Sequence, residues 1–342
     1  MKKTTIGGQA LLEGLLMIGP QYRATAIRKP NGEIVVEKQP MKPKSKLSKI
    51  PIVRGAVNLF TQMVIGVKAL MHSADFIDFE DGDKPYEPSK FEKFLERKFG
   101  DKITDIAIYF SVVLSIFFSV GLFVLLPNFI ANFMPVENVI VLNLIEGAIR
   151  VSLFIGYLAL VSLMKEMKRV WEYHGAEHKT IHCYENGDEL TIENVKKYTT
   201  KHPRCGTSLL FTIMVISILV FSFTGWHNVF INASIRILLV PVVAGVSLEI
   251  IKLVIKRENW IYKIVTAPGL MFQAFTTREP DDSQIEVAIA AFMEVLPVED
   301  GGKPIQEQEQ SQECQEQEQV RDQDQEQEHE QEQDQEQEQV QD

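Results

Sequence analysis

Long apolar stretches are the dominant pattern of the chain. Four of them have about the length of a membrane-crossing helix, which needs about 20 residues, and they lie at 106–126, 139–164, 208–225 and 233–255. Leu, Ile, Val and Phe occupy all sides of each predicted helix, which is typical of a lipid-exposed or fully buried helix. One such stretch could be a buried core helix, but four in one chain predict an all-α, multi-pass membrane protein with four transmembrane helices.

The positions of Lys and Arg predict the orientation in the membrane. Residues 1–105 hold 18 of these cations and residues 165–207 hold 8, whereas the loops after the first and third apolar stretches hold none. Cytoplasmic segments of membrane proteins carry the excess of positive charge. We therefore expect a cell-membrane protein with the lipid bilayer as its main partner. Both termini and the 165–207 segment would be cytoplasmic, and any protein partner would bind on that side.

The remaining segments divide the chain into five parts. β-compatible residues on either side of an Asn31-Gly32 turn predict a β-hairpin at 22–39, after a Gly-rich N-terminal segment. Polar residues of 52–71 fall on one helical face, which predicts an amphipathic helix at the interface or against the bundle. The five parts are the cytoplasmic Gly-rich segment and hairpin (1–50), amphipathic helices (51–102), the transmembrane bundle with its cytoplasmic segment (103–257), C-terminal interfacial or cytoplasmic helices (258–300) and a tail (301–342).

Composition changes this picture mainly at the C-terminal end. The tail from Gly301 contains 15 acidic and 2 basic residues, so residues 1–300 carry a net charge of +2 although the whole chain carries −11. Its Gln-Glu and Gln-Asp repeats cannot bury enough apolar surface to offset the entropy of ordering, which predicts disorder. Three cysteines give no disulfide framework and favour a reducing compartment. The motif G-x-x-x-x-G-K-[ST] does not occur, which argues against nucleotide binding, and we expect no nucleic-acid partner.

Three of the seven histidines lie four residues apart in YHGAEHKTIHCYE, at 173–185. On a helix, His174 and His178 share one face and can hold a single metal ion. His182 is rotated by about 80° from His174, so it could join the same ion only if the helix unwound. Glu177 completes the pattern H-x-x-E-H, the inverted form of a zinc-protease motif in which the glutamate is a general base. The alternative is a row of interfacial histidines that hydrogen-bond to carbonyls or lipid phosphates.

A second group of metal-ligand residues precedes the third apolar stretch. In KHPRCGTS, at 201–208, His202 and Cys205 form an H-x-x-C pair whose spacing suits two ligands on one tight turn. Both groups lie at the cytoplasmic ends of adjacent apolar stretches, so we expect them at one depth. Imidazole with thiolate favours zinc, followed by iron or another divalent transition metal. Four protein ligands would make the site structural, whereas three would leave a position for water and catalysis.

Charged residues inside the apolar stretches are costly in a bilayer and need partners. Glu146 and Arg150 are spaced i,i+4 and are predicted to pair with each other. Glu249 lies near the cytoplasmic end of the fourth stretch. It could reach the metal site as a ligand or support a ligating histidine, or it could pair with Lys252 at the interface.

The motifs GGQALLEG, HGAEHKTIHCYE, HPRCGTS and APGLMFQAFTTREPDDSQIEVAI follow one another between residues 4 and 297. In sequence and order they resemble the YqhQ-like family of bacterial membrane proteins. The resemblance implies a multi-pass plasma-membrane protein and a metal-dependent enzyme of unknown substrate. The Gln-rich tail departs from the family pattern. The residues that match the family motifs are His174, Glu177, His178, His182, His202 and Cys205.

Three functions are compatible with these residues. In the first, a metal-dependent hydrolase, the first two histidines of the helix motif hold the ion, His202 or Cys205 completes the shell, and Glu177 takes a proton from water. In the second, a structural zinc site fixes the cytoplasmic segment to the bundle of a non-enzymatic scaffold or assembly factor. The third, an ion or metal transporter, needs a polar path across the bilayer, and the charged groups considered above form no convincing relay.

Overall fold

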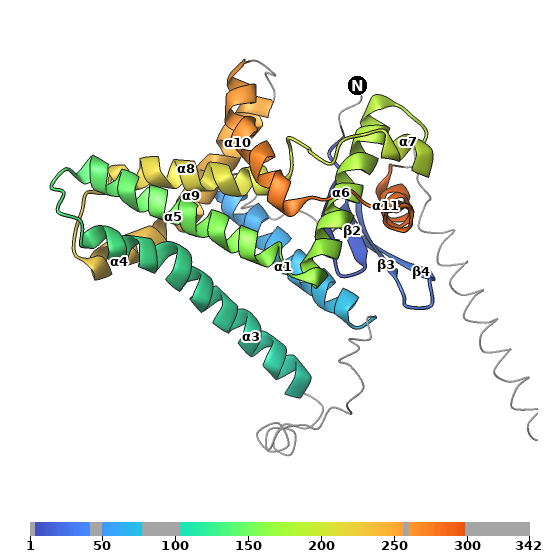
Figure 1. The fold of residues 1–342 in the computed structure, drawn as a ribbon, viewed down its shortest axis with the longest axis horizontal. Coiled ribbons are helices and arrows are strands. Elements are labelled where there is room, and N and C mark those ends of the chain that lie inside the picture. Colours follow the sequence, from blue (N-terminus) through green and yellow to red (C-terminus); the bar gives the residue numbers. More distant parts are fainter. Residues whose placement is uncertain (1–3, 42–49, 77–102, 256–259, 298–342) are drawn as a thin grey trace, which may run out of the picture.

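The described part of the chain is mostly helical and has two regions (Figure 1). One is a set of long apolar helices, and the other is a small antiparallel sheet with helices packed against it at one end of that set. The predicted tail and residues 77–102 of the predicted amphipathic segment lie outside the described residues. The computed structural model describes residues 4–41, 50–76, 103–255 and 260–297.

The N-terminal sheet is a four-stranded antiparallel meander in the order β1-β2-β3-β4. Its strands are β1 (Gly7–Leu11), β2 (Gly14–Ile18), β3 (Tyr22–Arg28) and β4 (Ile34–Pro40). The hairpin predicted at 22–39 is confirmed by the pairing of β3 with β4. Gly32 in its loop has φ +90°, a conformation that glycine adopts without strain. The prediction was incomplete for the Gly-rich segment before the hairpin, since this segment forms β1 and β2.

Alternating side chains of β2 pack against helices on both faces of the sheet. Leu15 and Met17 join a core that includes residues of α6 and α11, whereas Leu16 points to the other face and packs near Ala69. The sheet therefore lies between α6 and α11 on one face and the end of α1 on the other. The helices around the sheet are α6 (Lys165–Asn186), α7 (Ile192–Lys196) and α11 (Asp282–Val295), with α1 (Val53–Ala74).

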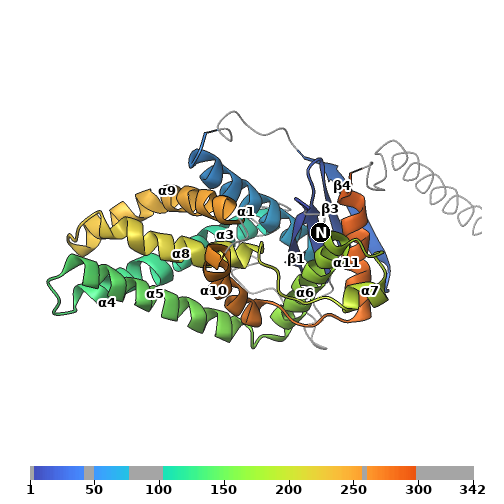
Figure 2. The same ribbon diagram turned by 90° about the horizontal axis from the view of Figure 1, so that it is seen from above.

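The apolar helices α5, α8 and α9 lie side by side and lead away from the sheet (Figures 1 and 2). A π-helical turn at Gly121–Leu125 joins α3 to α4. The helices of this region are α3 (Ile103–Val120), α4 (Leu126–Asn132), α5 (Val139–Val161), α8 (Gly206–Ser222), α9 (Val229–Ile255) and α10 (Trp260–Thr276).

Length and composition support three membrane spans among the described helices rather than the predicted four. The helical stretches that are long and apolar enough are Phe110–Asn132, Val139–Val161 and Val229–Val254. The stretch predicted at 208–225 forms the apolar helix α8, which has only 17 residues. The apolar helices therefore suggest association with a membrane, and the fourth span is not established.

The helix that carries the histidines is separate from the second apolar stretch. The sequence predicts one uninterrupted helix, but α5 ends at Val161 and α6 begins at Lys165, after a turn in which Met164 has ψ 137°. The Ser162 hydroxyl in this turn donates a hydrogen bond to the carbonyl oxygen of Phe275 in α10, at 2.8 Å. Because of this break, α6 runs in its own direction between the bundle and the sheet (Figures 1 and 2).

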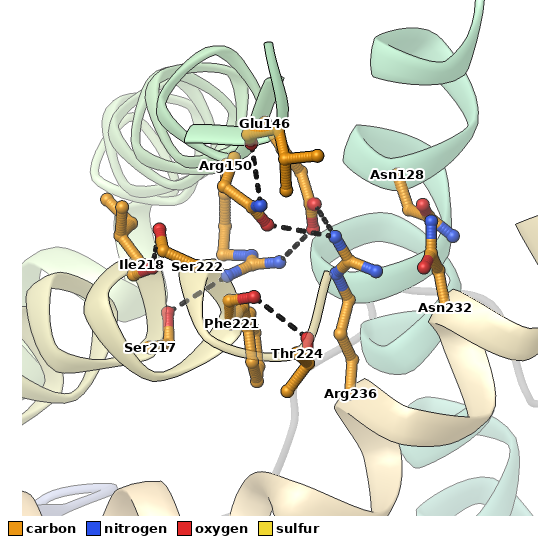
Figure 3. Close-up of polar contacts among 12 residues, drawn as sticks. Asn128, Glu146, Arg150, Ser217, Ile218, Phe221, Ser222, Thr224, Asn232 and Arg236 are labelled. Atoms are coloured by element: carbon orange, nitrogen blue, oxygen red, sulfur yellow. Dashed lines mark hydrogen bonds and ion pairs between the residues drawn. The ribbon is translucent and has the colours of Figure 1, made fainter. Parts of the chain in front are cut away.

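A buried charge cluster joins α5, α8 and α9 (Figure 3). Glu146, which is 1% exposed, accepts a hydrogen bond from Arg150 at 2.5 Å and forms an ion pair with Arg236. Arg150 also donates to the Ser217 hydroxyl at 2.9 Å. The ring of Phe221 lies 5.3 and 5.4 Å from the two guanidinium carbons. The predicted pairing of Glu146 with Arg150 is confirmed, but Arg236, which sequence analysis did not consider, is a second cation on the same carboxylate.

Glu249 holds α1 against α9. Its carboxylate accepts a hydrogen bond from Arg54 Nε at 2.5 Å, so its hydrogen-bonded partner is neither the metal-ligand group nor Lys252. The two helices approach closely nearby, since a Cβ on Gly55 would lie 2.6 Å from the Cα of Gly245. The helix α1 therefore packs against the bundle, one of the two placements predicted for the amphipathic helix.

Glu146→Gln keeps the size of the side chain but leaves two buried guanidinium groups without a carboxylate. Breaking a buried ion pair costs about 3–5 kcal/mol, so we expect a clear fall in the thermal unfolding temperature in detergent, measured by circular dichroism. Glu137→Gln, in the exposed loop before α5, is the matched control and should change this temperature little. Equal stability of the two variants would show that the cluster does not hold the helices together.

Candidate metal centre

The helix α6 is buried on most sides although it is rich in polar residues. It packs against β1, β2, α7 and α11, and it hydrogen-bonds to residues that follow α7 and to the end of α10. The closest approach is at Gly175, where a Cβ would lie 2.0 Å from the carbonyl oxygen of Arg278. Glycine at this position lets the segment after α10 lie directly on the helix.

His174 and His178 are held in the same way by two backbone carbonyls. His174 Nδ1 lies 2.7 Å from the carbonyl oxygen of Thr276, and His178 Nδ1 lies 2.6 Å from that of Thr200. Since a carbonyl oxygen only accepts, both Nδ1 atoms carry a proton, which leaves Nε2 with the free electron pair in the neutral rings. His178 Nε2 is buried and has no hydrogen-bond partner in the described part of the chain. Metal-ligating histidines are oriented by such bonds to the second ring nitrogen.

Cys205 brings a sulfur atom to these two rings from the N-cap position of α8. Its Sγ lies 3.1 Å from His174 Nε2 and 3.2 Å from the hydroxyl oxygen of Thr207. One ligand atom from each of His174, His178 and Cys205 lies within 4.8 Å of the other two. Two imidazoles and one thiol from two helices therefore form a compact group, which we call the first ligand group.

Burial and neighbouring groups set the protonation of this first ligand group. Burial lowers the pKa of His178 to about 4, and the charge of His174 acts in the same direction, so the His178 ring is neutral at neutral pH. Burial alone would raise the pKa of the Cys205 thiol. The neighbouring His178 ring and the hydrogen bonds from Thr207 outweigh burial, and the net pKa of Cys205 is lowered. Neutral imidazole and thiolate are the forms that bind a metal.

Glu177 lies on the same helix and reaches β1. Its Oε1 accepts a hydrogen bond from the backbone N–H of Gly8 at 2.8 Å, and its Oε2 is buried with no partner among the residues that the structure describes. Burial raises the pKa of Glu177 to about 7, although the charge of His174 opposes this shift. A carboxyl group that titrates near neutral pH can take up and return a proton.

His182 and His202 lie beside the first ligand group and not in it. With Glu185 they form a second set of three residues whose ligand atoms lie within 4.8 Å of one another, which we call the second ligand group. The two groups are adjacent, because the His202 ring centroid is 5.5 Å from that of His178 and 4.7 Å from that of His182. The residues predicted as ligands of one ion are thus divided between two neighbouring groups.

Glu185 is a member that sequence analysis missed. Its signal was the spacing His182-x-x-Glu185, which places both side chains on one side of a helix. Burial alone would raise the pKa of Glu185, but the neighbouring His202 ring and the hydrogen bonds from Arg204 and the backbone N–H of Thr4 lower it to about 2. The carboxylate is therefore ionised at neutral pH. The carbonyls of Thr200 and Thr276 and the N–H of Gly8 had no sequence signal, since any residue type supplies a backbone group.

The fold and these groups define a class: a mostly helical chain with apolar helices suited to a membrane, and a buried His/Cys/Glu cluster beside them. Residues 50–298 match the family described as "Protein of unknown function (DUF1385)". The chain is also 35% identical over 303 residues to the uncharacterized protein YqhQ of Bacillus subtilis (strain 168), across 86% of this chain and 92% of that protein. The chain therefore belongs to the DUF1385 family, and the predicted relationship to YqhQ is confirmed. No solved structure matches it.

The two cysteines of the described chain should differ in their reaction with an alkylating reagent. Cys183 is fully buried, and burial raises its pKa to about 11, so we expect it to stay unmodified in the folded protein. Cys205 is partly exposed and its pKa is lowered, so it should react. Peptide mass spectrometry after brief labelling of a metal-free Cys314→Ser variant measures both sites, and unfolded protein serves as the control for Cys183. Equal labelling of the two cysteines in the folded protein would contradict the geometry described above.

Proposed function

We propose that this chain is a metal-dependent hydrolase of the cell membrane, in which His174, His178 and Cys205 hold zinc or another divalent transition metal ion. One observation carries the proposal: each histidine gives Nδ1 to a backbone carbonyl, which leaves both Nε2 atoms for the group that contains the Cys205 sulfur. Without an ion, the buried His178 Nε2 lacks a partner within the described chain, which costs about 1–3 kcal/mol. A bound ion would remove that cost.

Three protein ligands are the number found at catalytic zinc sites, where a fourth position stays open. These three residues would hold the ion, whose chemistry there would be to lower the pKa of water and to polarise the carbonyl of an ester or amide. In this proposal Glu177, on the same helix as both histidines, would act as the base. Its Oε1 is fixed on the Gly8 N–H, while Oε2, which has no partner in the described residues, is free to accept a proton and return it to a leaving group.

A structural zinc site is the second candidate, and the position of the ligands favours it. The first ligand group joins α6 to the start of α8, and His174 is held by the end of α10. An ion there would fix the soluble region to the apolar helices, as a scaffold or assembly factor requires. In this case a fourth protein ligand would close the shell and exclude water.

The membrane arrangement that we propose has four spans. With 17 residues, α8 is at the lower end of the range of about 17–25 residues for transmembrane helices, and α5 and α9 pack beside it. Lys and Arg are abundant before α3 and between α5 and α8, and absent from the loops after α4 and α8. By the positive-inside rule, the metal centre and both termini are cytoplasmic.

Metal content is the direct test of the first ligand group. Wild-type protein purified in detergent without chelators should retain about one tightly bound ion per chain, measured by mass spectrometry. His178→Ala removes a ligand and should lose this ion, whereas His227→Ala, in the loop between α8 and α9, should keep it. The absence of stoichiometric metal from the wild type would overturn both the hydrolase and the structural site.

Glu177→Gln separates the two candidate functions. If Glu177 is the base, this variant should keep the tight ion and lose hydrolysis of ester and amide test substrates by about 100-fold or more. Cobalt-substituted protein gives an independent measurement, since added azide changes the visible spectrum of a shell with an open position. A spectrum that azide does not change, together with loss of the ion in Glu177→Gln, would instead support a closed structural site with Glu177 among its ligands.

A further inference from the structure

Beside the first ligand group, a second one is built on the last turn of α6 and the loop after α7. We propose that His182, Glu185 and His202 bind a second divalent metal ion, which makes the centre a two-metal site. The three residues offer ligand atoms within 4.8 Å of one another. His202 and Glu185 are 5% and 4% exposed, so the ion would be held largely away from solvent.

The gap between His202 and Glu185 is the first argument. His202 Nε2 lies 3.8 Å from Glu185 Oε2, which is too long for a direct hydrogen bond. Two ligand atoms that bind one zinc ion at about 2.0–2.2 Å each lie at a comparable separation. A small movement of either side chain would therefore bring both atoms to one ion.

The way in which the side chains are held is the second argument. Glu185 Oε1 accepts a hydrogen bond from the Thr4 N–H at 2.8 Å and forms an ion pair with Arg204. The other oxygen, Oε2, lies on the side of His202. His182 Nε2 lies 3.0 Å from the carbonyl oxygen of Lys201, so Nδ1 is the nitrogen left for a ligand. Both side chains thus have one atom fixed by the protein and another presented, as in the first ligand group.

The two sites differ in donor type and in strength. The first group offers two nitrogens and a sulfur, whereas the second offers two nitrogens and a carboxylate oxygen, a set also found at zinc sites and suited to harder divalent ions. Arg204 Nη2 lies 3.4 Å from His202 Nε2. Because an ion would have to compete with this cation, the second site is the weaker of the two and fills after the first.

The adjacency of the two groups links this inference to the proposed hydrolase, on which its catalytic meaning rests. The His202 ring lies between those of His178 and His182. Two ions held side by side can stabilise both the attacking and the leaving oxygen of a substrate. The second ion would therefore deepen the proposed chemistry without replacing any ligand of the first.

Cobalt titration of metal-free, full-length protein in detergent tests the second site. Absorption from a thiolate–cobalt bond distinguishes the first ligand group from the second, because the second contains no cysteine, and equilibrium dialysis with mass spectrometry counts all bound ions. We expect two ions per wild-type chain. The first equivalent should produce the thiolate band, and the second should leave that band unchanged. Wild-type protein that saturates at one ion with a full thiolate band would overturn the second site and leave the proposed function standing.

Two variants assign the equivalents to residues. His182 is partly exposed, so His182→Ala should fold, as checked by circular dichroism, bind one ion and keep the thiolate band. Cys205→Ser should lose the band and keep an ion at the second site. Binding of two ions by His182→Ala would refute the assignment. Ions bound without any thiolate band in the wild type would instead remove the proposed first site.

Discussion

A polar helix is buried at the centre of the soluble region, and the partners of its polar side chains determine how the surrounding segments are arranged. Burying a polar group without a hydrogen bond is costly. Several buried polar side chains of α6 therefore form hydrogen bonds with the backbone of other segments. Gly8 of β1 bonds to Glu177, Thr200 bonds to His178, and Thr276 bonds to His174. The few ring and carboxylate atoms that remain without partners in the described chain lie in or beside the first ligand group, where chemistry rather than packing explains them.

Buried polar groups also need partners in the apolar region, where the partners are oppositely charged side chains. There, Glu146 is shared by Arg150 and Arg236, and the aromatic face of Phe221 lies near both cations. Three helices are thereby fixed in register, because the cluster forms only when all three supply their members. This end of the bundle is held by charge, whereas the other end contacts the soluble region through the hydrogen bonds of His174 with Cys205 and of Ser162 with Phe275.

The sequence was most informative where a single residue type decides the outcome. Long apolar runs predicted α3, α5 and α9, the Asn31-Gly32 turn predicted the hairpin, and the histidine spacing predicted the pair His174 and His178. The predicted pair of His202 with Cys205 is divided between the two ligand groups. The sequence did not predict the helix break after Val161, because no proline or glycine lies there. The break depends instead on a contact with α10. The sequence did not predict strands β1 and β2, because glycine is disfavoured in strands. In the structure β2 is paired along its length with β3. The division of the ligands into two groups arises from how the 197–205 loop folds onto α6, which residue spacing does not encode.

The contact between Gly8 and Glu177 joins residues 169 positions apart, and this separation has a consequence for biosynthesis. The strand that holds the carboxylate is made before its partner, which follows the apolar stretches at 110–132 and 139–161, and the carbonyl of Thr276 that orients His174 is made later still. Until then β1 lacks α6, although α1 is already available to pack against it. The centre can therefore be completed only after the apolar helices that precede Thr276 have been made, so its geometry depends on segments from almost the whole described chain.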